Sequence, residues 1–435
     1  MYWLLYMKAI NLNASDLDQK AKIITITPDK VLSIKQASDL LSVSLDTIRR
    51  WEKKGLVKAH RNKNQHRFFQ TEELLALHTK LSGGNGVGFK ILKSDKKTDF
   101  SVVELFAGAG GLALGMNHAG LNCHLLVEID KTASTTLAQN RPAWNVINDD
   151  IANVDFKKVK ADIVAGGFPC QAFSYAGKRL GFEDIRGTLF FEYARAVDEV
   201  KPSIIIAENV KGLEKHDEGR TLSTMLRILD DLGYRVEYRI LRAQYLDVAQ
   251  KRERLVIIGV RKDLALPIAF PKEQNYTISI REALLNVPPS TGQKYTDTKR
   301  QIMQLVPEGG YWRELPIDLQ KTYMGASYYL GGGKTGMARR LAWDEPSLTL
   351  TCNPAQKQTE RCHPSETRPL TVKEYSRIQS FPDDWQFHGS TALQYKQIGN
   401  AVPVNLAYHI GRCVIAMLNN SLDDNTMVII PKKLD

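Results

Sequence analysis

Two short segments of the sequence carry side chains that can form and break bonds, and each directly follows a run of apolar residues. GGFPCQ, residues 166–171, follows the run 163–165, and ENV, residues 208–210, follows the run 204–207. The cysteine of the first segment, Cys170, stands behind a proline on a strand-end loop, where a thiol is exposed and its thiolate can act as a nucleophile. Glu208 supplies a carboxyl group that can donate or accept a proton. The pair predicts covalent catalysis assisted by an acid.

A third segment, QKRER at residues 250–254, precedes the apolar run 255–260. Strand alternation places Gln250, Arg252 and Arg254 on one face. Two fixed guanidinium groups can hold a phosphate or a base carbonyl. Taken singly, each of these charges has an ordinary alternative as part of a surface ion pair.

A glycine-rich turn, FAGAGG at residues 106–111, follows the apolar run 102–106 and precedes a helical segment. Gly108-x-Gly110-x-x-Ala113 fits the nucleotide-binding pattern loosely. Glu128 ends the next strand 20 residues after Gly108, where an acid can accept hydrogen bonds from ribose hydroxyls, and Asp150 can bind an adenine amino group. The alternative is a tight turn that serves packing alone.

These residues need a scaffold that brings strand ends together, and the apolar runs supply one. The runs 102–106, 124–128, 163–165, 204–207 and 255–260 are rich in β-branched residues and are separated by helix-length stretches. This pattern predicts an α/β fold with a doubly wound, mostly parallel sheet of buried strands. Ligands bind such sheets at the carboxyl ends of the strands, which is where the chemical groups are found.

Residues 32–77 show a different pattern, that of a compact helical DNA-binding module. The segment 33–36 has the form of a capping box at the start of a first helix. A second helix would carry Ile48 and Trp51 inward and would stop at Gly55. Its outward basic residues would be aimed at a DNA groove, followed by a wing at 56–69. The predicted DNA contacts of this head are Arg49, Arg50, Lys53 and Arg61.

The charge distribution supports an anionic partner for the head. The chain has 435 residues, with 59 Lys and Arg against 48 Asp and Glu and a net charge of +11. Residues 1–97 hold 18 basic and 9 acidic side chains, so most of the excess lies there. DNA is the natural partner of such a surface. A solvated basic face, or a two-helix packing module without a ligand, are the alternatives.

Composition excludes several classes of protein. With 43% hydrophobic and 25% charged residues, wholesale disorder, a fibrous repeat and a membrane bundle are excluded. Five cysteines give no disulfide framework, and Cys123, Cys352, Cys362 and Cys413 are interpreted as small buried residues. They lack the paired spacing of a zinc site, so no metal is expected. The opening MYWLLYM is too short to span a bilayer, and we expect a cytoplasmic protein.

Six segments, read in order, resemble the motifs of DNA (cytosine-5)-methyltransferases of restriction-modification type. They are ELFAGAGG, GGFPCQ, ENV, QKRER, RPLTVKEYSRIQSFPDDW and QIGNAVPV, and the resemblance covers about 102–419. It implies a Rossmann-like S-adenosylmethionine methyltransferase domain. Residues 33–69 resemble the winged helix-turn-helix head of MerR-type regulators and phage excisionases.

The resemblance implies a mechanism. The thiolate of Cys170 would add to C6 of a flipped cytosine, and Glu208 would stabilise the ring through N3. The activated C5 would take the methyl group of S-adenosylmethionine. Arg254 would touch the flipped base, and Arg252 would support the catalytic loop.

The resemblance also implies the surroundings of both ligands. S-adenosylmethionine would contact Phe106, Gly108, Gly110, Glu128, Ile129, Asp150, Ile151, Phe168, Leu189 and Asn400. DNA would contact Gln171, Ser174 and Gln250 in the catalytic body. Two positions depart from the family pattern. Ile129 stands where an aromatic residue is common, and Asp149-Asp150 replaces the more usual Gly-Asp.

The predicted organisation has five parts. They are a helix-turn-helix head (1–81), a flexible linker (82–99), a catalytic S-adenosylmethionine-binding domain (100–262), a target-recognition domain (263–367) and a C-terminal segment that completes the catalytic domain (368–435). The expected partner is double-stranded DNA, with no membrane and a cognate restriction endonuclease acting on the same site. Catalysis by a monomer is expected.

Two other functions compete with this one. Methylation of a tRNA cytosine is an activity of one branch of the same family, although the long recognition segment and the DNA-type head argue against it. A transcription regulator, in which the head acts and the body senses the cofactor, is the other. The sequence motifs do not reveal the DNA site that is recognised.

Overall fold

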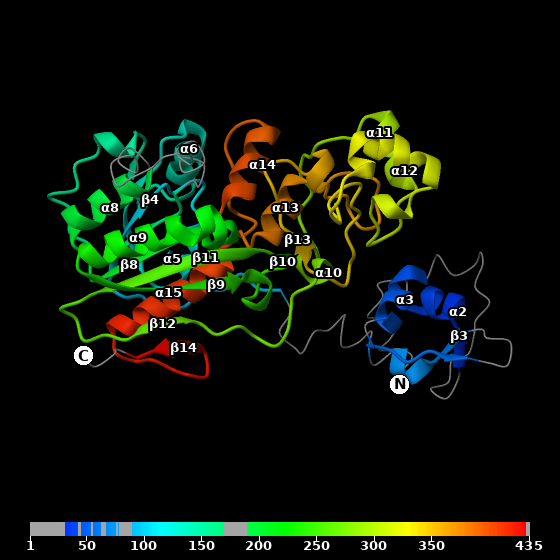
Figure 1. The fold of residues 1–435 in the computed structure, drawn as a ribbon, viewed down its shortest axis with the longest axis horizontal. Helices are drawn as coiled ribbons and strands as arrows, with labels where there is room; N and C mark the ends of the chain where they lie inside the picture. Colours follow the sequence, from blue (N-terminus) through cyan, green and yellow to red (C-terminus); the bar gives the residue numbers. More distant parts are fainter. Residues whose placement is uncertain are drawn as a thin grey trace. The chain divides into compact units, whose positions relative to one another are not determined.

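A computed structural model describes residues 31–41, 45–53, 55–61, 67–74, 77, 89–168 and 189–431. The chain divides into two compact units, residues 1–81 and 82–435. The first unit coincides with the predicted head. Figure 1 shows the elements of each unit.

The head is a pair of helices with a small sheet. Its elements are β1 (Val31–Ser33), α2 (Ile34–Leu41), α3 (Leu45–Lys53), β2 (His60–Arg61) and β3 (Arg67–Gln70), with strand order β1-β3-β2. The capping box is confirmed, because Gln36 N donates to Ser33 Oγ (3.3 Å) and Ser33 N donates to Gln36 Oε1 (3.0 Å). Ile48 and Trp51 are buried in the head's own core, and Gly55 ends the second helix with φ 69°. The β2–β3 hairpin is the predicted wing.

The second unit is built on a seven-stranded sheet with the order β6-β5-β4-β7-β8-β11-β9. Its strands are β4 (Ser101–Leu105), β5 (Asn122–Val127), β6 (Val146–Ile147), β7 (Ile163–Gly166), β8 (Ile204–Val210), β9 (Tyr234–Arg242) and β11 (Glu253–Arg261). The pairs among β6, β5, β4, β7 and β8 are parallel. The strand order reverses direction between β4 and β7, which marks the expected ligand-binding position.

One predicted strand direction is wrong. The run 255–260 was expected to be parallel, yet β11 pairs antiparallel with both β8 and β9. An apolar run is buried equally well in either direction, so its composition carries no direction. The reversal has a functional consequence. Arg254, near the start of β11, pairs with Val210 at the end of β8 and so lies at the edge where the parallel strands end.

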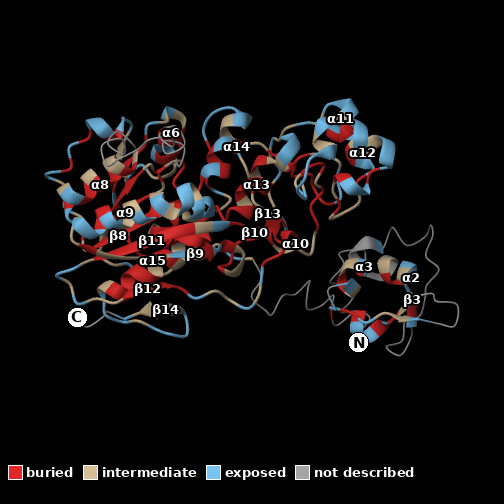
Figure 2. Ribbon diagram, in the orientation of Figure 1, coloured by how far each residue is buried: buried red, intermediate tan, exposed pale blue. Residues whose placement is uncertain are grey.

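Helices cover both faces of this sheet. On one face, α5 (Gly111–Ala119) and α15 (Val404–Leu418) share a core cluster with Val102, Ile163 and Ile204. On the other face, α8 (Leu189–Val200) and α9 (Arg220–Asp231) pack on Val103, Val164 and Ile205. Figure 2 shows the buried strands between helices whose outer sides are exposed.

The remaining body elements complete these layers. They are α6 (Lys131–Asn140), α13 (Val372–Ile378), α14 (Thr391–Asn400) and the short helices η2 (Ile151–Asn153), η3 (Lys211–Gly219) and η4 (Ala243–Tyr245). The stretch Thr391–Leu418 is apolar and long enough to cross a membrane by composition, but 78% of its most apolar window is buried inside the body. It is therefore a core element here.

Residues 89–99 are not the flexible linker that was predicted. Asn405 holds this strap, accepting from Leu92 N (3.0 Å) and donating to Lys90 O (2.8 Å). Ser94 N and Thr98 N donate to carbonyl groups at the end of α5. The polar composition of 89–99 was misleading because its backbone, not its side chains, makes these contacts. The remaining predicted linker residues, 82–88, lie outside the described part of the chain.

The recognition segment starts later than predicted. Strand β12 (Ile268–Pro271) pairs with β14 (Met427–Ile430) and packs in the same core cluster as α15. The catalytic body therefore continues through Pro271 rather than ending at 262. The following segment has its own core around Met303, Trp312 and Cys362. Its elements are α10 (Ile280–Ala283), α11 (Asp297–Gln304), η5 (Trp312–Glu314), α12 (Ile317–Met324), η6 (Gly325–Tyr329), β13 (Ser347–Leu348) and η7 (Lys357–Thr359), with β13 parallel to β10 (Gln250–Lys251).

Candidate active site

A cavity of about 700 Å³ opens where β4, β5, β7 and β8 end. Three predicted catalytic residues line it: Glu208, Arg252 and Arg254. Most predicted cofactor residues line it as well: Phe106, Gly108, Glu128, Ile129, Asp150, Ile151, Phe168, Leu189 and Asn400. The structure thus brings together groups that are up to about 300 residues apart in the sequence.

The glycine-rich turn forms one wall of the cavity. Phe106 and Gly108 have φ of 57° and 56°, a left-handed conformation that costs a non-glycine residue energy and is often found at functional sites. A Cβ at Gly108 would meet no atom within 4 Å, so it faces open space. Gly110 differs, because a Cβ there would lie 2.6 Å from Leu137 Cδ2. Gly110 does not line the cavity and serves helix packing.

Glu128 is held in place by two backbone amides. Gly108 N donates to its Oε2 and Asp130 N to its Oε1, both at 2.7 Å. The side chain is 8% exposed, and burial raises the pKa of Glu128. Hydrogen bonds from fixed amides leave the carboxylate oriented at the cavity wall, where it can accept from hydroxyl groups.

Asp150 lies at the opposite, exposed end of the cavity. Its Oδ1 accepts from Ala152 N (3.0 Å) and caps η2, while Asp149 Oδ1 accepts from Asp150 N (2.7 Å). Ile129 is 67% exposed and presents an apolar surface to the cavity. An amino-bearing planar group has both a hydrogen-bond acceptor and an apolar contact here.

Glu208 and Arg254 form a nearly buried ion pair in the cavity wall. Arg254 Nε lies 2.7 Å from Glu208 Oε1, and each side chain is 12% exposed. Burial lowers the pKa of Arg254, and the Glu208 carboxylate opposes this change. The pair fixes the carboxyl group of Glu208 and leaves its second oxygen near Gly167, where a Cβ would lie 3.0 Å from Oε2.

Arg252 holds the far wall together. It donates to Leu350 O (3.3 Å), Gly399 O (3.2 Å) and Ala401 O (3.1 Å). Burial, with the nearby Arg254 charge, lowers the pKa of Arg252 to about 9. It thereby positions the backbone on both sides of Asn400. The catalytic loop that Arg252 was predicted to support lies outside the described residues.

Gln250 was predicted to contact DNA, and the structure contradicts this. The side chain is fully buried: its amide donates to Gln379 Oε1 (2.8 Å), and its carbonyl accepts from Leu350 N (2.9 Å). A group with both hydrogen-bonding ends used inside the core is inaccessible to a ligand. Gln250 instead joins the body to the recognition and C-terminal segments.

Cys170, Gln171 and Ser174 lie outside the described part of the chain, so their placement stays a prediction. The strand that leads to them is well anchored. Asn209 Nδ2 donates to Phe168 O (2.9 Å), and the Phe168 ring packs against Phe190 at 5.4 Å between ring centroids. The segment carrying Cys170 thus departs from beside Glu208 and Asn209.

Sequence reasoning missed two sets of cavity residues. Helix α14 contributes Leu393, Lys396 and Gln397, and Lys396 Nζ pairs with Asp130 Oδ2 at 3.1 Å across the cavity edge. Neither has a local sequence signal. Glu104 also lines the cavity, from within β4. A glutamate inside the otherwise apolar run VVELF is a signal that could have identified it.

The cavity fits S-adenosylmethionine by the chemistry of its wall. The cofactor carries ribose hydroxyls, an adenine and two cationic groups. Glu128 offers a fixed carboxylate, Ile129 an exposed apolar surface and Gly108 open space beside the backbone. Glu104 adds a buried carboxyl oxygen that has no hydrogen-bond partner among the described residues.

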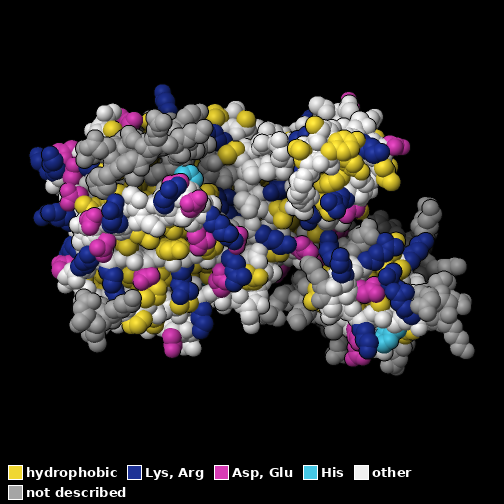
Figure 3. All heavy atoms as spheres, viewed as in Figure 1, with side chains coloured by type: hydrophobic (Ala, Val, Ile, Leu, Met, Phe, Trp, Pro, Cys, Tyr) yellow, Lys and Arg dark blue, Asp and Glu magenta, His cyan; other side chains and the backbone are white. Residues whose placement is uncertain are grey.

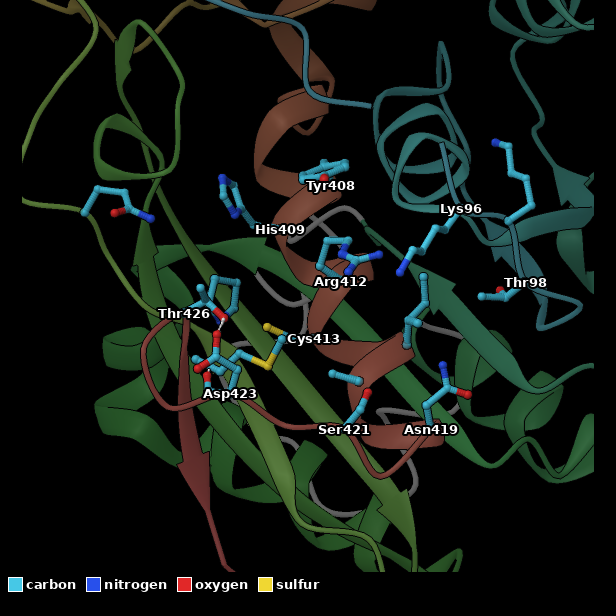
Figure 4. Close-up of a pocket in the computed structure, with 16 residues that line it drawn as sticks. Lys96, Thr98, Tyr408, His409, Arg412, Cys413, Asn419, Ser421, Asp423 and Thr426 are labelled. Atoms are coloured by element: carbon cyan, nitrogen blue, oxygen red, sulfur yellow. Dashed lines mark hydrogen bonds between the residues drawn. The ribbon is translucent and has the colours of Figure 1, made fainter. Parts of the chain in front are cut away.

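A second cavity, of about 600 Å³, lies at the opposite edge of the sheet. It is lined by α15, by the strap and by the residues around β14, and none of the predicted site residues belongs to it. In Figure 4, Lys96 and Arg412 point toward each other across it. It is separate from the strand-end site.

The head presents a basic surface. Arg49, Lys53 and Arg61 are exposed and Arg50 is half-buried. Lys and Arg side chains gather on the head's visible face in Figure 3. The one acid of the basic run, Glu52, pairs with Arg67 at 3.0 Å and ties α3 to the wing. The predicted contacts therefore share a positively charged module with its own core.

Solved structures show the same fold for the body. A prophage-encoded DNA modification methyltransferase from E. coli, described as putative in its title, matches with TM-score 0.54 and 23% identity over 74% of this chain and all of that one. A Spodoptera frugiperda DNMT2 variant matches with TM-score 0.52 and 18% identity over 73% of this chain and all of that one.

Sequence relatives are much closer. Type II methyltransferase M.Eco47II of Escherichia coli is 53% identical over 89% of this chain and 96% of its own length. Type II methyltransferase M.PspPI of a Psychrobacter strain is 54% identical over 91% and 99%. Residues 82–435 make up about four fifths of the chain, so both matches extend into the head.

Family models match both units. Residues 33–69 match the MerR family regulatory proteins, in agreement with the helix-turn-helix of the head. Residues 100–416 match the C-5 cytosine-specific DNA methylases. With the strand-end cavity and relatives above 50% identity over most of their length, the chain belongs to the C-5 cytosine-specific DNA methylase family and uses S-adenosylmethionine to methylate cytosine in DNA.

Proposed function

We propose that methyl transfer proceeds through covalent attack of Cys170 on C6 of a cytosine flipped into the strand-end cavity. The observation that supports this most directly is the Glu208–Arg254 pair beside Gly167. Cys170 follows Gly167 by three residues, so the nucleophile and a fixed carboxyl group belong to adjacent strand ends. The site residues named above keep their predicted roles, with Gln250 and Gly110 excepted.

Each group has a defined task. The Cys170 thiolate adds to C6, which makes C5 nucleophilic, and Glu208 hydrogen-bonds or protonates N3 to stabilise the displaced charge. S-adenosylmethionine supplies the methyl group. A base then removes the C5 proton, and the thiolate leaves as the C5–C6 double bond re-forms. Arg254 fixes Glu208 and faces the same cavity as the base.

Bisulfite sequencing tests the proposal. Plasmid DNA is incubated with the protein and S-adenosylmethionine, which identifies the methylated cytosines. An oligonucleotide with 5-fluorocytosine at that position should then form a complex stable to denaturing electrophoresis, because fluorine at C5 blocks the elimination step. Cys170→Ser should give no complex and no methylation. A full-rate Cys170→Ser enzyme, or labelled methyl transfer into RNA but not DNA, would refute the proposal.

We further propose that the methylation protects host DNA from a restriction endonuclease of the same specificity. The support is the similarity to relatives named Type II methyltransferases. A nuclease fraction from the source cells should cut unmethylated plasmid but not plasmid methylated by this protein. Equal cutting of both would contradict a protective role.

We propose that the head binds its own promoter as well as assisting the enzyme on DNA. The specific support is the match of residues 33–69 to regulatory proteins. Footprinting of the full chain on its upstream DNA should show a protected region, which Arg49→Gln with Arg50→Gln removes. Protection that persists in this variant would place the contact elsewhere.

A further inference from the structure

Glu104 is an acid in a position that normally holds an apolar residue. It lies in β4 between Val103 and Leu105, and its side chain is 2% exposed. The backbone amide of Ala113, in the first turn of α5, donates to its carboxyl group. Its Oε2 has no hydrogen-bond partner in the described part of the chain, although Glu104 lines the cofactor cavity. A buried carboxyl oxygen without a partner costs about 1–3 kcal/mol or more, so its retention needs a reason.

The surroundings of Glu104 contain no cation. From β5 it is faced by Glu128 and the Cys123 thiol, and from α5 by a backbone amide. Its β7 neighbour is Ala165, which is apolar. The charged groups elsewhere in the cavity are Glu208, Arg252, Arg254, Asp130, Lys396, Asp149 and Asp150. Burial raises the pKa of Glu104 well above its usual value, and the Glu128 carboxylate raises it further.

Two carboxyl groups that share one cavity suit a cationic ligand. S-adenosylmethionine carries a sulfonium, an ammonium and one carboxylate, a net charge of +1. The product S-adenosylhomocysteine has lost the sulfonium charge and is neutral overall. A charge that disappears during the reaction can be detected by an acid close to the point of ionising.

We propose that Glu104 senses the charge of the bound cofactor. It releases its proton to solvent when S-adenosylmethionine enters, and its carboxylate then faces the cation. It takes a proton back from solvent once the bound molecule is S-adenosylhomocysteine. The site therefore favours the charged methyl donor over the neutral product and helps the product leave.

The sign of the pH dependence follows. Because Glu104 must lose a proton to hold the cation, affinity for S-adenosylmethionine rises with pH up to the pKa of Glu104 in the free protein. Affinity for S-adenosylhomocysteine needs no such loss and changes less with pH. The preference for the donor should therefore widen as the pH increases.

Isothermal titration calorimetry in two buffers of different ionisation enthalpy measures the protons released on binding. We expect release with S-adenosylmethionine and clearly less with S-adenosylhomocysteine. In Glu104→Gln the difference should vanish, and donor affinity should fall about tenfold while product affinity changes less than about twofold. Glu360→Gln is a matched control, since Glu360 is also fully buried but pairs with Lys299 in the recognition segment.

The wild-type measurement alone can overturn the proposal, so it does not depend on the variant folding. Equal proton release with donor and product would refute it. Unchanged release in a folded Glu104→Gln protein would assign the proton to Glu128 and refute it as well. Because cofactor binding is measured without DNA, failure here leaves the Cys170 mechanism untouched.

Discussion

At the scale of single residues, Arg254 and Glu208 are each other's principal charge partner in the cavity wall. With both side chains 12% exposed, water screens the pair weakly. Replacing Arg254 by Ala would leave Glu208 largely buried without its cation. We expect a loss of about 3 kcal/mol of unfolding free energy, measured by urea denaturation, together with loss of methyl transfer.

The exposed pair of Arg242 with Glu273 provides the control. Its arginine side chain is 53% exposed, so Arg242→Ala should cost less than about 1 kcal/mol. Similar unfolding midpoints for Arg254→Ala and the wild type would show that Glu208 does not depend on Arg254.

Residues at strand ends were predictable because a polar group beside an apolar run stands out. Glu128, Glu208 and Arg254 were found this way. Gln250 and Gly110 were misassigned because their sequence context is the same as that of exposed groups. Only the packing of distant segments, such as Gln379 on Gln250, reveals that they are structural.

At the scale of elements, α5 must approach α15 closely to seal the face of the sheet beneath the cavity. Gly115 permits this, because a Cβ there would lie 2.3 Å from Val404 O and 2.4 Å from Ala407 Cβ. Gly115→Ala should therefore cost about 3 kcal/mol in thermal or urea unfolding. Gly212→Ala, whose Cβ would have 4.0 Å of clearance, should be nearly neutral. Equal effects of the two substitutions would contradict this packing.

The junction of the strap with α5 should respond to acid. His118 is 5% exposed, and burial, with Lys93, Arg141 and Lys97 nearby, lowers the pKa of His118 to about 4. The unfolded chain, with a pKa of about 6.5, binds this proton more readily, so stability falls as the pH drops below 6.5. Between pH 7 and pH 5 this histidine should cost about 2 kcal/mol. Urea unfolding of His118→Gln should lack this part of the loss, and identical losses would refute the assignment.

The elements themselves were largely predictable, since periodicity marks buried strands and capped helices. Direction and partners were not. β11 is antiparallel and β12 pairs with β14, which follows it by more than 150 residues. Such pairings depend on chain topology, which local sequence does not encode.

At the scale of the whole molecule, the positive charge and the catalytic chemistry belong to different units. The strand-end cavity is built within residues 82–435, whereas the head has a separate core and most of the excess charge. Division of labour follows: the body supplies the chemistry and its own DNA cleft, and the head supplies additional attraction to phosphates.

Salt dependence tests this division. Each phosphate contact releases counterions, so replacing Arg49, Arg50 and Lys53 by Gln should lower the slope of log affinity against log salt by about 3. The matched control removes three lysines of an exposed loop before β7, Lys157, Lys158 and Lys160, which changes the net charge equally. DNA binding measured by fluorescence anisotropy between 50 and 200 mM salt, values chosen as about the range where such slopes are resolved, gives both slopes. If the control lowers the slope as much as the head variant, net charge alone explains DNA attraction and the head has no specific contact.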